Sequence, residues 1–263
     1  MNLLTDNPAL YEEQFPDPDH KAARFVHDIV RRFAGGRSLL DIGCGTGRDA
    51  GYLAGLGFRV HGVDNSTAMI THARTHHPTV GFTVGDMREF RLEETFDVIT
   101  CLDSALLYCH TNADLRAFLD RCRAHANPGA LLVAEMRNGA YFLGNTDLLD
   151  SVRTRTVTWQ GVPYTSDTTL WIDHAAQLLR RRREWRWPGA EPLVQHSAWR
   201  LLFPQELAMV LDLAGFDVLA MFDTPGPRTD PPWRTEAELG GSLSRDRLHL
   251  VARLRPHLRK GSR

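Results

Sequence analysis

Short apolar runs alternate with helix-like segments along most of this chain. Apolar residues repeat at helical spacing between 19 and 33 and predict a helix there. Five strands are predicted beyond it at 38–42, 59–63, 80–84, 96–101 and 130–136, with helices at 48–56, 66–75 and 113–126 and a turn at 127–129. Strands that alternate with helices in this way form parallel sheets, so the pattern predicts a doubly wound α/β domain with both sheet faces covered.

The pattern changes after Met136. Four β-like runs, at 152–159, 164–172, 177–187 and 194–203, are separated by turn-prone breaks. They predict an antiparallel β insertion after the fifth strand. A helix at 204–214 and strands at 216–222 and 247–254 then complete a mostly parallel, seven-stranded sheet. We expect the Pro/Thr/Gly-rich stretch 224–244 to be disordered, with a lid as the alternative.

Composition narrows the class of protein. The chain has 263 residues, 43% of them hydrophobic and 24% charged, which is ordinary for a globular protein. A formal net charge of -1 gives no field that would attract nucleic acid or a membrane surface. The four cysteines form no C-x-x-C pair, and the polar start of the chain is unlike a signal peptide. These features predict a reduced, cytoplasmic protein.

The most informative motif follows the first predicted strand and reads DIGCGTG, from Asp41 to Gly47. Its three glycines permit a tight turn and let backbone amides approach a ligand, because no Cβ intrudes. Asp41 would repel a pyrophosphate, so the turn suits a neutral or cationic ligand such as S-adenosylmethionine (SAM), whose amino group can bond to a carboxylate. A glycine-rich turn without any ligand is the alternative. The spacing also differs from the Gly-x-Gly-x-x-Gly of dinucleotide-dependent oxidoreductases.

Chemically suitable side chains follow the next strands as well. Asp64 closes the second strand, where a carboxylate can accept from both hydroxyls of a ribose. Asp86 and Met87 follow the third strand, where Asp86 would accept from an adenine amine and Met87 would pack on the ring. Ligands of doubly wound sheets bind outside the carboxyl ends of the strands, so these residues predict a SAM site at that edge. A helix-capping acid and a turn aspartate are the alternatives for the two carboxylates.

Several segments resemble a known family. LLDIGCGTG, VHGVDNSTAMITHAR and VGDMREFRLEETFDVITC are similar to successive motifs of class I SAM-dependent methyltransferases. The insertion and the opening segment NPALYEEQFPDPDHKAA resemble the bacterial subgroup that methylates amino sugars and antibiotic intermediates, including nucleotide-sugar N,N-dimethyltransferases. The resemblance implies a Rossmann-like methyltransferase fold with SAM as the cofactor.

The resemblance also implies a division of the chain. Residues 1–37 would form a helical cap over the cofactor, 38–138 and 204–255 the SAM-binding α/β domain, 139–203 an insertion on the substrate side, and 256–263 a disordered tail. The predicted cofactor contacts are Tyr11, Gly43, Gly45, Asp64, Asn65, Met69, Asp86, Met87 and Leu102.

Three residues are candidates for catalysis: Tyr11, His110 and Glu135. His110 lies at the start of the helix after the fourth strand, and Glu135 lies near the end of the fifth strand. Either residue is a candidate base. The alternatives are an exposed residue before a helix cap for His110 and a buried structural carboxylate for Glu135. Tyr11 could present its aromatic face to a cationic sulfonium, and Arg137 could bind an anionic substrate group.

A run of four arginines, Arg180–Arg183, lies in a predicted strand. Alternation places Arg180 and Arg182 on one face and Arg181 and Arg183 on the other. One face could bind a pyrophosphate, but a solvated face that pairs with acids across the sheet is the favoured interpretation. No metal-ligand spacing occurs, so we predict no metal.

We therefore expect a SAM-dependent methyltransferase that acts on a small-molecule acceptor, an amine nitrogen of an amino sugar or antibiotic intermediate. O- or C-methylation of a natural product is the alternative, and an oxidoreductase or an inactive SAM-binding protein ranks lower. The predicted partner is a small-molecule substrate rather than nucleic acid or a membrane. The oligomeric state stays open, with a homodimer as one option.

Overall fold

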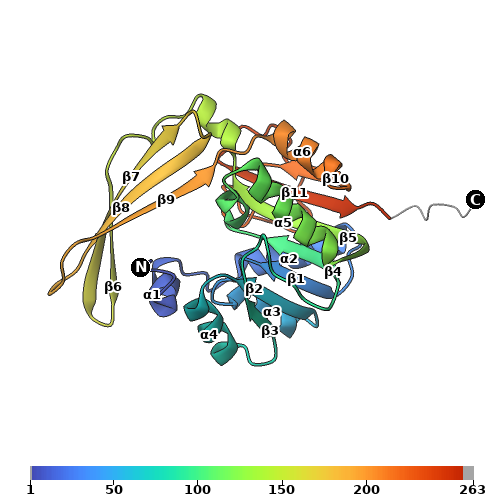
Figure 1. Cartoon of the computed structure of the whole chain (residues 1–263), viewed down its shortest axis with the longest axis horizontal. Coiled ribbons are helices and arrows are strands. Elements are labelled where there is room, and N and C mark those ends of the chain that lie inside the picture. The colour runs from blue at the N-terminus through green and yellow to red at the C-terminus, as the bar shows by residue number, and fades with distance from the viewer. Residues whose placement is uncertain (1, 257–263) are drawn as a thin grey trace, which may run out of the picture.

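Two β-sheets organise the molecule (Figure 1). The computed structural model describes residues 2–256, so most of the tail predicted at 256–263 lies outside the described residues. The larger sheet has the strand order β10-β11-β5-β4-β1-β2-β3. Its strands are β1 (Ser38–Ile42), β2 (Arg59–Asp64), β3 (Gly81–Val84), β4 (Phe96–Cys101), β5 (Ala126–Arg137), β10 (Phe216–Phe222) and β11 (Arg247–Leu254).

Strands β1 to β5 pair in parallel, and β11 is antiparallel to both of its neighbours. The predicted fold class, a mostly parallel seven-stranded α/β sheet with an antiparallel insertion, is confirmed. Alternating side chains divide the core between the two sheet faces, so that Leu39 and Leu40 join different hydrophobic clusters. Within residues 2–256, no helix is both long and apolar enough to cross a membrane.

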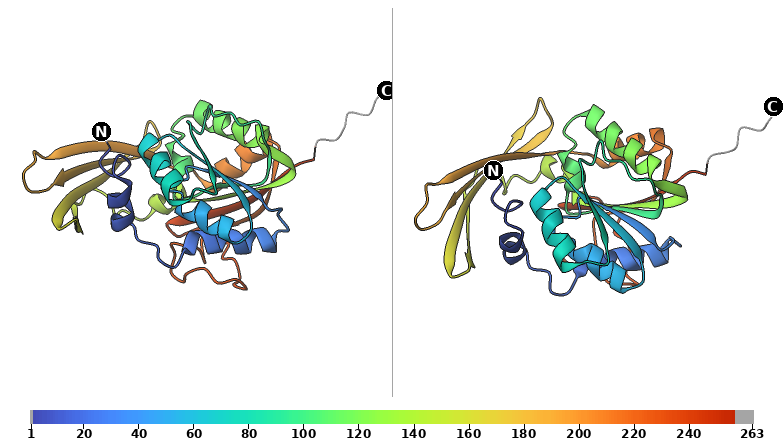
Figure 2. Two further views of the ribbon diagram at one scale, coloured as in Figure 1. Left: turned by 90° about the horizontal axis from the view of Figure 1, so that it is seen from below. Right: turned by 60° about the horizontal axis from the view of Figure 1, so that its bottom comes forward.

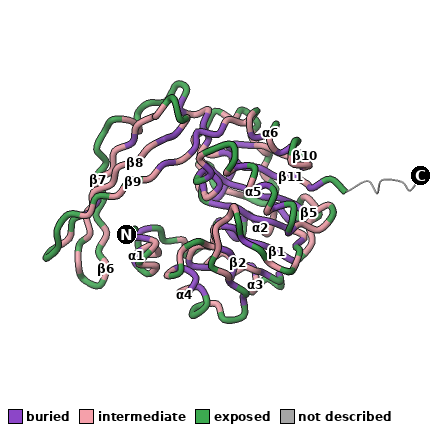
Figure 3. The backbone as a smooth tube through the Cα atoms, in the orientation of Figure 1, coloured by how far each residue is buried: buried purple, intermediate pink, exposed green. Residues whose placement is uncertain are grey.

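Helices cover both faces of the larger sheet (Figure 2). One face packs against α2 (Lys21–Arg32), α3 (Arg48–Gly55) and α4 (Thr67–His76). The opposite face packs against α5 (Asn112–Ala124) and α6 (Pro204–Leu213). Buried residues concentrate in this sheet and along the helix faces that contact it (Figure 3). The carboxyl ends of β1 to β4 lie together at one edge of this packed sheet.

The smaller sheet is the insertion. A short 3-10 helix, η2 (Gly139–Leu143), leads into β6 (Arg153–Trp159), β7 (Val162–Asp173), β8 (Leu178–Arg186) and β9 (Leu193–Arg200), each antiparallel to the next. The sheet extends away from the α/β domain, and α1 (Pro8–Gln14) lies between it and α4 (Figures 1 and 2). Arg155 of β6 donates to the carbonyl of Gln14 (2.7 Å), which fastens α1 to the insertion.

Two sequence expectations about the chain path are wrong. The predicted turn at 127–129 lies inside β5, where the register with β4 jumps and leaves a bulge. The stretch 224–244, expected to be disordered, has a defined path. Trp233 packs edge-on against Phe25 (ring centroids 4.9 Å apart) and donates to the carboxylate of Asp28 (3.0 Å). The loop is held because Trp233, a partly buried aromatic side chain, packs on the core, which the Pro and Gly content of the loop did not indicate.

Candidate functional site

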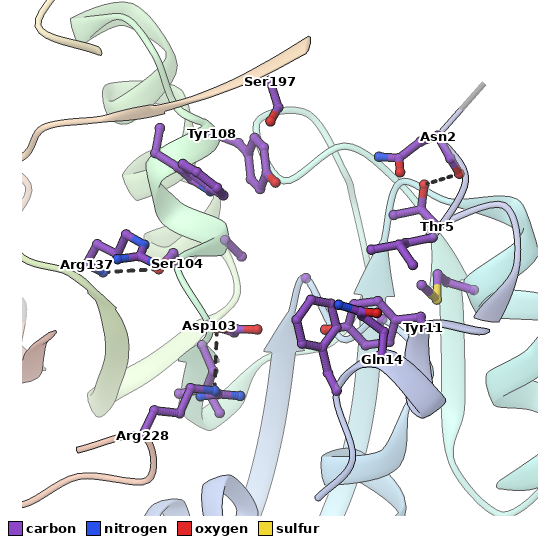
Figure 4. A pocket seen from close by; sticks show the side chains of 18 of the residues that line it. Asn2, Thr5, Tyr11, Gln14, Asp103, Ser104, Tyr108, Arg137, Ser197 and Arg228 are labelled. Atoms are coloured by element: carbon purple, nitrogen blue, oxygen red, sulfur yellow. Dashed lines mark hydrogen bonds and ion pairs between the residues drawn. The ribbon is translucent and has the colours of Figure 1, made fainter. Parts of the chain in front are cut away.

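A cavity of about 1080 Å³ opens where the carboxyl ends of β1 to β4 face the insertion (Figure 4). Small-molecule pockets usually measure about 300–1,000 Å³, so this one has room for a cofactor and an acceptor together. The structure brings all nine predicted cofactor residues to its wall. They are Tyr11, Gly43, Gly45, Asp64, Asn65, Met69, Asp86, Met87 and Leu102.

The glycine turn forms one end of this cavity. Gly43, Gly45 and Gly47 all adopt positive φ (78°, 53° and 75°), which residues with a Cβ rarely do. The N–H groups of Gly45 and Ser66 each donate to one carboxylate oxygen of Asp64, at 2.9 Å. These bonds fix the carboxylate and leave each oxygen a second lone pair for a ligand hydroxyl. Burial raises the pKa of Asp64. This arrangement fits the ribose of SAM.

Asp86 is held differently. Arg88 donates to both of its carboxylate oxygens, at 2.8 and 2.6 Å, and also to Asp114 (3.0 Å). These bonds to Arg88 keep the pKa of Asp86 below its usual value, so the carboxylate is ionised. An adenine amine at this position would share its acceptor with Arg88.

Asp41 does not face the ligand, which corrects the sequence interpretation. Asp41 belongs to β1, and its side chain is buried. It accepts a hydrogen bond from the hydroxyl of Thr100 in the neighbouring strand β4 (2.7 Å). Burial raises its pKa to about 7. Asp41 is not among the residues that line the cavity, so it supports the turn from inside the sheet.

Two of the three catalytic candidates lie outside the cavity wall. His110 lies with Nε2 2.9 Å from the carbonyl oxygen of Ala198 in β9, an acceptor that requires this nitrogen to carry the proton. Glu135 is fully buried and accepts from Arg228 (2.7 Å), Arg247 (2.9 Å) and the N–H of Asp103 (2.9 Å). Burial alone would raise the pKa of Glu135, but the two arginines hold it below its usual value. The geometry therefore gives no support to either residue as a base that touches substrate.

Tyr11 of α1 does line the cavity. Burial, together with the charge of Asp103, raises its pKa, so the hydroxyl stays protonated. Tyr11 can therefore offer a ligand an aromatic face and a neutral hydroxyl, but it is not suited to remove a proton.

The insertion lines the other half of the cavity with arginines. Arg181 and Arg183 donate to the hydroxyls of Ser197 (2.9 Å) and Thr168 (3.0 Å), and Arg181 lies over the ring of Trp199. Among residues 2–256 neither has a carboxylate partner in an ion pair. Burial lowers the pKa of Arg181, and that of Arg183 to about 10.

The opposite face of β8 behaves as a solvated, paired surface. Arg180 pairs with Asp173 (2.7 Å) and Arg182 with Glu184 (2.6 Å). The favoured sequence interpretation holds for Arg180, which pairs across the sheet, and in part for Arg182, whose acid partner lies in the same strand. It is wrong for Arg181 and Arg183, because the pleat directs them into the cavity.

Sequence reasoning gave Asp103 and Arg228 no side-chain role. Asp103 follows β4 and lines the cavity. Arg228 reaches the cavity from the 224–244 stretch that was expected to be disordered. No group of three or more His, Cys, Asp or Glu side chains suited to a metal ion occurs in the described part of the chain.

The strand order, the glycine turn and the strand-end carboxylates together define a class I, SAM-dependent methyltransferase fold. Residues 39–129 match a family described as a methyltransferase domain. The chain is 36% identical over 117 residues to a dTDP-3-amino-3,6-dideoxy-alpha-D-glucopyranose N,N-dimethyltransferase of Streptomyces fradiae, covering 44% of this chain and 46% of the relative. It is 35% identical over 127 residues to a dTDP-4-amino-2,3,4,6-tetradeoxy-D-glucose N,N-dimethyltransferase of Saccharopolyspora spinosa, covering 48% and 51%.

Similarity to solved structures extends further along the chain. A SAM-bound amino pentose methyltransferase from Micromonospora echinaspora superimposes with a TM-score of 0.70 at 25% identity, covering 94% of this chain and 95% of that one. A sugar N-methyltransferase from Streptoalloteichus has a TM-score of 0.73 at 23% identity, covering 94% and 91%. The sequence matches span about half the length of the curated relatives. The chain thus contains a methyltransferase domain, and SAM as the cofactor of this domain is confirmed.

Proposed function

We propose that this chain transfers a methyl group from SAM to an amine nitrogen of a small acceptor that also carries an anionic group. The favoured acceptor is an amino sugar attached to a nucleoside diphosphate. One observation carries the proposal: a single cavity joins the nine cofactor residues to two arginines, Arg181 and Arg183, that have no carboxylate partner within residues 2–256.

The strand-end half of the cavity would hold the cofactor. Asp64 would accept from the ribose hydroxyls, Met87 would pack on the adenine, and the Gly43–Gly45 backbone would follow the methionine portion. Tyr11 would cover the sulfonium with its ring, which makes α1 part of a cap over this half. When bound, SAM supplies a methyl group activated by positive charge on sulfur.

The insertion half would hold the acceptor. Burial lowers the pKa of Arg181 and Arg183 because it removes the water that stabilises their positive charge. A bound anion would stabilise that charge again through charge-assisted hydrogen bonds. A diphosphate matches two adjacent guanidinium groups in charge and in acceptor number. The relatives from Streptomyces fradiae and Saccharopolyspora spinosa, whose names describe dTDP-amino sugar N,N-dimethyltransferases, support the same choice. Such an acceptor is a cytoplasmic metabolite, consistent with four free cysteines.

Product analysis tests this proposal. The purified chain is incubated with SAM and dTDP-3-amino-3,6-dideoxy-α-D-glucopyranose, and in parallel with the same nucleotide sugar bearing a hydroxyl in place of the amine. We expect one or two methyl groups on nitrogen in the first reaction and none in the second, by mass spectrometry and NMR. Methylation of the hydroxyl compound alone would favour O-methylation. Absence of product in both reactions, with SAM bound, would refute this acceptor class.

A further inference from the structure

The cavity wall contains few groups that could take a proton. No histidine of residues 2–256 lines it, and Tyr11 has a raised pKa. Its acidic lining residues are Asp17, Asp64, Asp86 and Asp103. Asp64 accepts from two backbone N–H groups, Asp86 is bound at both oxygens by Arg88, and Asp17 accepts from the N–H that opens α2 (3.1 Å). Asp103 remains.

Asp103 has a carboxylate that faces the cavity, toward the side where Tyr11 lies (Figure 4). The side chain is 45% exposed, and its nearest cations are only loosely placed, with Arg228 at 3.4 Å and Arg247 at 3.7 Å. Its charge also contributes to the raised pKa of Tyr11. Asp103 thus has acceptor capacity for a substrate group, whereas Asp64 would bind the ribose and Asp86 is bound at both oxygens by Arg88.

The backbone around Asp103 is held in an uncommon conformation. Asp103 and Ser104 both have positive φ (47° and 66°), which is rare for residues with a Cβ. The end of β5 holds them there, because Glu135 accepts from the N–H of both residues through its side chain (2.9 Å) and its carbonyl (3.0 Å). Glu135 also binds Arg228 and Arg247, so one buried carboxylate positions both the aspartate and its two cations.

We propose that Asp103 receives the acceptor amine: its carboxylate binds the ammonium form and takes the proton that must leave before methyl transfer. This inference rests on the proposed function, since it requires an amine acceptor. One proton moves from nitrogen to a carboxylate oxygen of Asp103. The freed lone pair then forms the N–C bond as the S–C bond breaks, and sulfur keeps the bonding electrons. Water takes the proton from Asp103 as the methylated ammonium product leaves.

Titratable and charged groups from four elements lie around this carboxylate. They are Tyr11 of α1, Glu135 and Arg137 of β5, Arg228 of the 224–244 loop and Arg247 of β11. An ionised carboxylate accepts charge-assisted hydrogen bonds from an ammonium group, which is the role proposed for Asp103. An enzyme with such a carboxylate can bind the ammonium form of its acceptor. An enzyme without it can use only the small fraction of acceptor whose amine is neutral.

The test compares Asp103→Asn with Asp103→Glu and with the control Asp246→Asn. Asp246 carries a similarly exposed carboxylate 4.0 Å from Arg247 but does not line the cavity. With the dTDP-amino sugar as acceptor, we expect Asp103→Asn to lower kcat/KM about 100-fold, Asp103→Glu to recover part of it, and Asp246→Asn to stay near wild type. The rate of Asp103→Asn should fall about tenfold per pH unit below the pKa of the acceptor amine, and that of wild type should be flatter.

Calorimetry shows whether Asp103 binds the acceptor amine or instead contributes to SAM binding. With S-adenosylhomocysteine present, wild type should bind the amino nucleotide at least tenfold more tightly than its hydroxyl counterpart, and Asp103→Asn should lose that preference. An unchanged preference or rate would overturn the role of Asp103 while leaving amine methylation intact. Weaker SAM binding in Asp103→Asn, without loss of the preference, would make Asp103 a cofactor ligand and overturn the proposal. If neither nucleotide binds wild type, the proposed function fails and this role fails with it.

Discussion

Gly45 and Asp64 are joined across the cavity end by a hydrogen bond of 2.9 Å from the backbone N–H to a carboxylate oxygen. The two residues lie 19 positions apart in the chain, at the ends of neighbouring parallel strands. The bond holds the glycine turn and the carboxylate in a common geometry, so the residues that would contact ribose and methionine are placed relative to each other before any ligand binds.

Asp64→Ala should weaken SAM binding by at least about tenfold, because each hydrogen bond from a ribose hydroxyl to a carboxylate contributes about 1.5–3 kcal/mol. Isothermal titration calorimetry measures the change. Asp212→Ala, which alters an exposed carboxylate at the far end of α6, serves as the control and should bind SAM normally. Equal SAM affinity in both variants, with intact folding, would mean that the ligand lies elsewhere.

The two faces of β8 offer a matched comparison. Arg181→Ala and Arg183→Ala should each raise the KM for an anionic acceptor by about tenfold or more, since each removes a charge-assisted hydrogen bond donor from the cavity. Arg180→Ala and Arg182→Ala should change it by less than about twofold, since exposed ion pairs contribute little. SAM affinity should be the same in all four variants. Similar KM values on both faces would contradict an anion site in the insertion.

His110→Gln tests whether a base is needed at that position. Because Nε2 of His110 is committed to the carbonyl of Ala198, and glutamine can donate a similar bond, the rate of amine methylation should stay within about threefold of wild type. Steady-state kinetics gives the answer. A loss of about 100-fold without loss of folding would instead assign His110 a part in proton transfer, as hydroxyl methylation would require.

Asp41 should make stability depend on pH. Its folded-state pKa is raised from 3.8 to about 7, so the stability linked to its proton is complete below about pH 4 and is lost as the pH rises through 7. A shift of this size corresponds to roughly 4 kcal/mol. Asp41→Asn cannot ionise and keeps an oxygen that can accept from Thr100.

Urea unfolding between about pH 4 and pH 8 should therefore show the variant gaining stability relative to wild type as the pH rises. If the free energies of unfolding of wild type and variant changed in parallel with pH, the raised pKa of Asp41 in the folded protein would be refuted.

The regular parts of the fold were readable from the sequence because each strand and helix has its own apolar pattern. The cofactor half could be predicted for a similar reason: Asp64 ends a strand, Gly43 and Asp86 lie just beyond strands, and parallel strands bring their ends together. The resemblance to methyltransferases added Tyr11, whose segment has no strand to place it.

The acceptor half of the cavity could not be predicted from the sequence, because it is built by contacts between segments that no local sequence pattern specifies. The orientation of Arg181 relative to Arg180 depends on how the insertion turns toward the α/β domain, which strand periodicity leaves undetermined. Arg228 was missed because anchoring of its loop depends on Trp233 meeting Phe25, about two hundred positions away in sequence. Glu135 lies near the end of an apolar strand, and the arginines that balance its charge, Arg228 and Arg247, lie far along the chain from it.

The pleat of the insertion has a practical consequence for changing acceptor choice. Along the middle of β7 and β8, alternate side chains line the cavity: Ser166, Thr168 and Leu170 from β7, and Arg181 and Arg183 from β8. These positions belong to a different sheet from the strands that carry the glycine turn and Asp64. An engineer could therefore exchange the inward residues one at a time for new acceptors, and the cofactor half would keep its own supports throughout.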